Sequence, residues 1–112
     1  MLFIVMHKLN AEIEAGGPPP KSLVENMHQL IGDTIKAGRF HDGAGLKGSE
    51  ERVRLKFSGG KRTVEKGPYR GQNELVANFA MLKVKSMDEA IEWASRYAAV
   101  LGAAEVEVGA VT

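Results

Sequence analysis

The feature that most constrains the fold is a run of strand, turn and helix signals between Arg52 and Trp93. Basic and apolar residues alternate over RVRLKF with the period of a strand, and Gly59 and Gly60 follow directly. Because glycine accepts the positive φ angles of a tight turn, this pattern predicts a β-hairpin. The apolar segment Leu75–Val84 then predicts a strand that is buried on both pleat faces.

Two helices are predicted from apolar residues at helical spacing. One covers Leu23–Ala37, preceded by a capping-box pair of Ser22 and Glu25. The other covers Met87–Leu101, where the capping-box pair is Ser86 and Glu89 and Gly102 ends the helix.

Further strands are predicted at both ends of the chain. Leu2–Met6 is continuously apolar, and residues 105–110 alternate between apolar and acidic residues or glycine. Residues 39–49 contain three glycines and are predicted as turn material. The order of elements fits one α+β domain over residues 1–112, a two-layer sandwich with both helices on one face of the sheet.

A homodimer is predicted because both faces of the sheet contain apolar residues. Two helices on one face would leave the other face open, and we expect Val76, Ala80 and Leu82 there, with their neighbours in the first strand. Two such faces packed about a two-fold axis would bury this surface.

Composition excludes several classes of function. The chain has no cysteine, which rules out disulfides and thiolate chemistry. The net charge is +1, so we expect neither nucleic acid nor a membrane as partner. The apolar start, Met1–Met6, is too short for a signal peptide or a spanning helix, and we expect a cytoplasmic protein. There is no nucleotide-binding fingerprint and no pair with metal-ligand spacing, so no cofactor or metal is expected.

Three residues are candidates for acid–base catalysis. His7 lies at the end of the first strand, and an imidazole there titrates near neutrality. His41 is followed by Asp42, whose carboxylate could orient an imidazole and favour its charged form. The alternatives are a strand-end residue that bonds to water or a backbone carbonyl for His7, and a polar turn for the pair.

The hairpin region is strongly basic. Residues 52–70 contain seven basic residues and one acid, a local charge of +6. Arginine forks beside a glycine-rich turn can hold a phosphate or carboxylate. The candidate ligand-binding residues are Arg54, Lys66, Tyr69 and Arg70. The alternative is a solvated strand edge whose charges prevent mispairing.

The motifs SGGKRTV, Gly67-Pro68-Tyr69, ELVANF and VKSMDEAIEWA occur in this order. With them the chain resembles the YCII-related family, in its DGPF-domain branch, and the likeness runs nearly end to end. The resemblance implies a ferredoxin-like fold with an antiparallel sheet, assembled as a dimeric α+β barrel. Other branches have a proposed catalytic histidine–aspartate pair from separate parts of the chain, which the neighbours His41 and Asp42 do not reproduce. The acidic residues usual in this branch are replaced here by Ala44, Lys66 and Gly71.

The expected function is binding of a small polar or anionic metabolite in a cleft of the homodimer. Its walls would come from the end of the first strand, residues 39–46 and residues 66–70. One alternative is a lyase or isomerase that uses a His/Asp acid–base pair. Another is an interaction module in transcription regulation.

Overall fold

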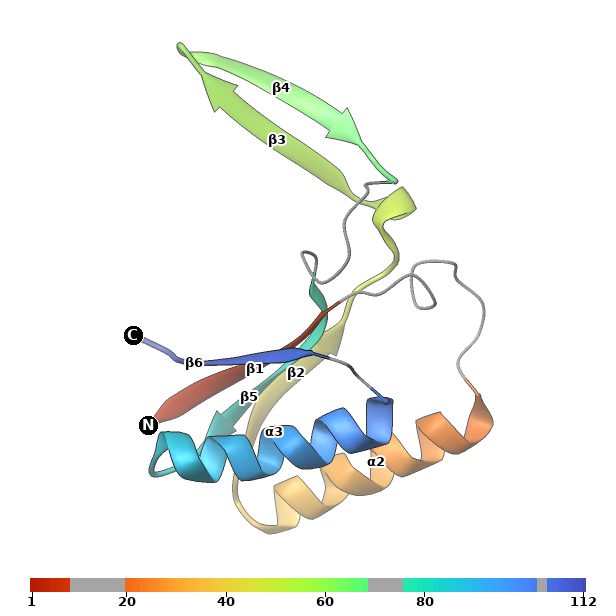
Figure 1. Cartoon of the computed structure of the whole chain (residues 1–112), viewed down its shortest axis with the longest axis vertical. Coiled ribbons are helices and arrows are strands. Elements are labelled where there is room, and N and C mark those ends of the chain that lie inside the picture. Colours follow the sequence, from red (N-terminus) through yellow and green to blue (C-terminus); the bar gives the residue numbers. More distant parts are fainter. Residues whose placement is uncertain (9–19, 69–75, 103–104) are drawn as a thin grey trace.

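The structure, a computed structural model, describes residues 1–8, 20–68, 76–102 and 105–112. Two helices lie side by side on one face of a sheet, and a hairpin extends on the opposite side of that sheet (Figure 1). The elements are β1 (Leu2–Lys8), α2 (Lys21–Lys36), β2 (Phe40–Gly45), a 3₁₀ turn (Ser49–Glu51), β3 (Val53–Ser58), β4 (Lys61–Lys66), β5 (Val76–Lys83), α3 (Met87–Leu101) and β6 (Val106–Ala110).

The main sheet is antiparallel, with strand order β2-β5-β1-β6. Each helix connects two strands that are not neighbours in the sheet, because β5 lies between β1 and β2 and β1 lies between β5 and β6. This is the split β-α-β arrangement of a ferredoxin-like sandwich. The predicted α+β fold class is therefore confirmed.

The core lies between the helices and one face of the sheet. The pairs Phe3–Leu82 and Val5–Ala80 lie opposite each other in the β1–β5 register. These residues are at most 4 % exposed and form one cluster with residues from both helices. The helical residues of this cluster are Leu30, Ala90, Ala94 and Tyr97.

The prediction that Ala80 and Leu82 lie on the open face of the sheet was wrong. Ala80 and Leu82 are 4 % and 0 % exposed and belong to the core. The open face instead carries Phe79 and Met81, which alternate with them along β5. Because β5 is apolar on both faces, its alternation does not reveal which face receives the helices.

Two local predictions were also wrong. Residues 40–45 form the edge strand β2, because pairing with β5 overrides the weak strand propensity of its glycines. Helix α2 begins at Lys21 with Pro20 as its N-cap, and no side chain caps it, so Ser22 lies inside the first turn. The capping pair of α3 is confirmed, since the Ser86 hydroxyl accepts a hydrogen bond from the Glu89 amide.

The predicted hairpin is confirmed, but it is a separate two-stranded sheet. β3 and β4 pair only with each other among the described strands. Gly59 and Gly60 form the turn with φ angles of 56° and 77°, the positive values that a two-residue hairpin turn needs. The sandwich and the protruding hairpin give the molecule extents of 46 × 35 × 19 Å.

Candidate functional site

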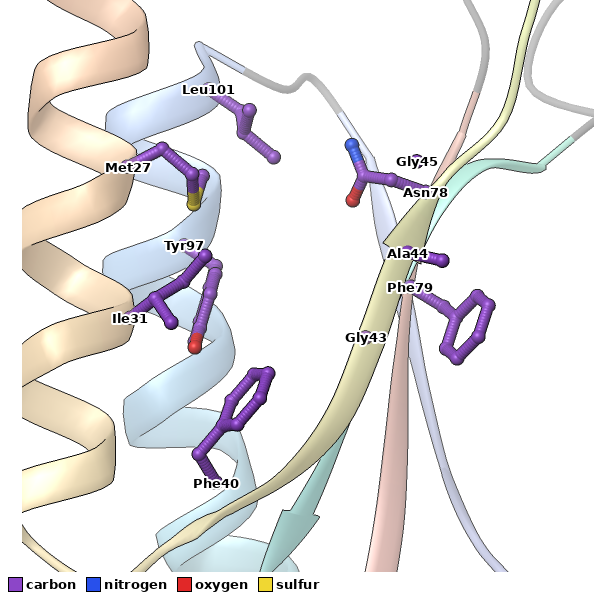
Figure 2. A pocket seen from close by; sticks show the side chains of 10 residues that line it. All are labelled: Met27, Ile31, Phe40, Gly43, Ala44, Gly45, Asn78, Phe79, Tyr97 and Leu101. Atoms are coloured by element: carbon purple, nitrogen blue, oxygen red, sulfur yellow. The ribbon is translucent and has the colours of Figure 1, made fainter.

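A pocket of about 250 Å³ lies between the helices and the β2–β5 side of the sheet (Figure 2). Met27 and Ile31 on α2 and Tyr97 and Leu101 on α3 line one wall. Phe40 lies at one end, and Asn78 points into the pocket from β5 (Figure 2). Most of the lining is apolar, so the pocket suits a ligand with an apolar body.

The glycines of β2 make room for this pocket. Gly43 and Gly45 pair with Ala80 and Asn78 and therefore face the helices, whereas Ala44 pairs with Phe79 on the open face. A Cβ atom at Gly45 would have no heavy atom within 4 Å, so this position borders open space. A Cβ at Gly43 would lie 2.9 Å from the Phe79 carbonyl oxygen, which is too close. The segment that sequence patterns predicted as a turn is thus a strand whose missing side chains shape a cavity.

His7 lies beside the pocket, on the same face of the sheet. It is 2 % exposed and pairs with Asn78 in the β1–β5 register. Its ring centroid lies 6.1 Å from that of Tyr97. Asn78 and Tyr97 both line the pocket, so His7 is in the layer of side chains directly behind the lining.

The imidazole of His7 is desolvated. Burial lowers the pKa of His7 below its ordinary value of 6.5, while the Asn78 side chain acts in the opposite direction. Neither ring nitrogen forms a hydrogen bond of normal distance and angle with a described residue. A buried polar group in this state gains free energy from any partner that reaches it. His7 is therefore neutral near pH 7 and can accept or donate a hydrogen bond.

Tyr97 is held in place by the buried hydroxyl group of Thr34. The Thr34 hydroxyl donates to the Leu30 carbonyl at 2.6 Å, which leaves its oxygen to accept from the Tyr97 hydroxyl at 3.2 Å. Burial raises the pKa of Tyr97, so the phenol stays protonated at neutral pH. These contacts fix the ring that forms part of the pocket wall.

The structure does not bring the three candidate catalytic residues together. His41 and Asp42 are exposed on β2, and His41 sits at an irregularity in the strand pairing. Asp42 pairs with Met81 and so lies on the open face, opposite to His7. Its carboxylate accepts a hydrogen bond from the Gly43 amide at 2.8 Å. A catalytic role for any of the three stays a prediction.

Arg54 and Lys66, two of the candidate anion-binding residues, lie outside the pocket. Arg54 is on β3, and Lys66 ends β4. Neither is among the residues that line the cavity. Tyr69 and Arg70, like Gly71, lie outside the described residues. The predicted link between the basic hairpin and a ligand cleft is therefore not formed by the described part of one chain.

Sequence reasoning missed Asn78 and Tyr97. Asn78 had a usable signal, because it is the one polar residue in the segment Leu75–Leu82. A polar side chain in a doubly buried strand needs a partner or a cavity. Tyr97 gave no such signal, since an aromatic residue at helical spacing is typical of a core.

No group of three or more metal-binding side chains is present in the described ranges. No helix within them is both long enough and apolar enough to span a membrane.

No curated protein matches the chain. The sequence model of the YCII-related domain matches residues 1–111, nearly the whole chain. The chain therefore belongs to the YCII-related domain family.

Proposed function

We propose that this protein binds a small molecule in the pocket between the helices and β2, and that it does so as a homodimer. The observation that carries the proposal is the 250 Å³ pocket, because a glycine-lined strand leaves it open and Asn78 points into it. The ligand has an apolar body of the size of one aromatic ring system and at least one hydrogen-bonding group. The body would contact Met27 and Ile31, and the polar group would pair with Asn78.

An anionic group of the ligand would lie at its polar end, next to Asn78. Asn78 offers an amide donor, and neutral His7 lies next to it in the register. A hydroxyl, carbonyl or carboxylate can bind such donors. An acid–base function of His7 belongs to the same proposal, and it requires the polar group of the ligand to come within hydrogen-bond distance of the imidazole.

The homodimer would form through the open face of the sheet. Leu2, Ile4, Met6, Phe79 and Met81 lie on that face and are partly exposed in one chain. Such an apolar surface is unusual on a soluble monomer. Dimerisation, the DGPF branch and a cytoplasmic location are all parts of this proposal.

A leucine at Gly45 tests the pocket. A Cβ atom at this position would meet no heavy atom within 4 Å, and a leucine side chain would extend from it into the cavity that Gly45 lines. Indole and benzoate are suitable probes, because both fit the volume and only benzoate is an anion. We expect millimolar indole to shift the Asn78 side-chain amide in NMR spectra of the wild type. Gly45→Leu should weaken this binding at least tenfold.

Gly45→Ala is the matched control, because its methyl group occupies far less of the cavity. It should retain binding within about threefold. Tighter binding of benzoate than of indole would support an anionic ligand. If neither probe shifts Asn78, or if Gly45→Leu binds as well as the wild type, the proposed site is wrong.

A further inference from the structure

The hairpin presents an apolar face that nothing in the described chain covers. Cross-strand pairing places Leu55 opposite Val64, with Val53 and Phe57 on the same face at positions two residues away. These four side chains are 47 %, 47 %, 60 % and 73 % exposed, respectively. A two-stranded hairpin is at best marginally stable alone in water. An apolar face on such a protruding element therefore indicates a docking surface.

The hairpin is also opposite in charge to the rest of the molecule. Residues 52–66 contain six basic residues and one acid, a net charge of +5. The whole chain has 15 basic and 14 acidic residues, which leaves nine basic and 13 acidic residues elsewhere, a net charge of −4. Electrostatic attraction thus favours contact between the hairpin of one copy and the body of another.

The border of the open sheet face is complementary in charge to the hairpin. The centre of this face, with Ile4 and Phe79, is the surface proposed above for the sheet-to-sheet contact, and exposed acids lie on both edge strands. Asp42 is next to Met81 on the β2 side, and Glu107 is next to Met6 on the β6 side. On the hairpin, basic residues instead of acids lie next to the apolar ones, because Arg62 pairs with Phe57 and Lys66 pairs with Val53. Lys8 and Lys83 are at strand ends, away from this centre.

We propose that the hairpin is a docking arm for a second copy of this chain. Its apolar face packs on that copy, with Arg62 and Lys66 beside the acids that border the copy's open sheet face. The arm extends on the side of the sheet where the second copy would lie (Figure 1). This inference rests on the homodimer proposed above and adds a second contact to it.

The chain contains no cysteine, so a single introduced thiol reports on one position. Phe57→Cys places the thiol on the apolar face, and Thr63→Cys places a matched control on the opposite face. We measure alkylation by N-ethylmaleimide from 1 to 200 µM protein, with the oligomeric state followed by sedimentation. Where the protein is dimeric, Phe57→Cys should react at least tenfold more slowly than Thr63→Cys. The two rates should converge on dilution to monomer.

A second variant, Leu55→Ser combined with Phe57→Ser, tests the contribution of the arm to assembly. It should raise the dimer dissociation constant at least tenfold, and salt should weaken the wild-type dimer, because charge pairs contribute. If the double-serine variant dimerises as tightly as the wild type and Phe57→Cys is not protected in the dimer, the docking role of the hairpin is overturned and the proposed dimer is not. A wild type that is monomeric throughout would overturn the arm and the proposed dimer together. Protection that arises only on adding a DNA duplex would overturn the choice of partner.

Discussion

At the scale of single residues, His7 makes the stability of the fold depend on pH. Burial lowers the pKa of His7 in the folded state below the value of 6.5 that it has when unfolded. Protons therefore bind the unfolded state more strongly. The stabilising effect of the neutral buried ring is fully present above pH 6.5. It is lost as the pH falls from 6.5 through the lowered pKa of the folded state.

We expect the free energy of unfolding to decrease over this acidic range in the wild type and less in His7→Phe. Urea denaturation from pH 4.5 to 8 measures it. Identical pH profiles for the two proteins would contradict the assignment, whatever their absolute stabilities.

The two glycines that face the pocket should respond differently to the same substitution. Gly43→Ala forces a Cβ to within 2.9 Å of the Phe79 carbonyl oxygen, a backbone atom that cannot move alone. We expect a loss of about 1–3 kcal/mol of stability, typical of overpacking. Gly45→Ala meets no atom within 4 Å and should cost less than about 0.5 kcal/mol. Thermal or chemical unfolding compares the pair, and equal losses would show that the register of β2 is different.

At the scale of elements, the two helices begin in different ways. In α3 the Ser86 hydroxyl accepts from the Glu89 amide at 3.2 Å, and the Glu89 carboxylate accepts from the Lys85 amide at 3.0 Å. Helix α2 has no side-chain cap. The two serines that precede apolar helical patterns are thus not equivalent, although their sequences look alike.

Ser86→Ala should destabilise the protein by about 0.5–2 kcal/mol, because the Glu89 amide loses its acceptor. Ser22→Ala is the control and should change stability by less than about 0.5 kcal/mol, since Ser22 is exposed within the first turn. The measurement is the midpoint of urea denaturation. A larger loss at Ser22 than at Ser86 would contradict the capping described here.

At the scale of the whole molecule, neighbouring residues of β5 belong to different environments. Leu82 is completely buried between sheet and helices, whereas Met81 lies on the open face that we propose as the dimer interface. A lysine at Leu82 would bury an unpaired charge and should prevent folding. A lysine at Met81 should leave the fold intact and produce a monomer.

Circular dichroism and analytical ultracentrifugation of Met81→Lys and Leu82→Lys separate the two effects. Folded Met81→Lys that remains as dimeric as the wild type would contradict an interface on the open face. A folded Leu82→Lys would contradict the assignment of that side chain to the core.

Local sequence signals determined several elements of this protein. The Gly59–Gly60 pair determined the hairpin turn, because both positions need positive φ. Ser86 determined the start of α3, and Gly102, with a φ of 63°, its end. These features depend on backbone geometry and hydrogen bonds within a few residues, so they can be predicted without the rest of the chain. The family motifs, read in order, indicated the ferredoxin-like arrangement that the structure shows.

Tertiary structure decided the rest, because it depends on which surfaces meet. β5 is apolar on both faces, and only the packing of the helices selected Ala80 and Leu82 for the core. Gly43 and Gly45 became strand residues and pocket lining only through pairing with β5. The same pairing placed Asp42 on the face opposite to His7, which separates two candidate residues that sequence alone could not locate. Side-chain alternation is a local property, whereas the identity of the covering layer is a property of the whole fold.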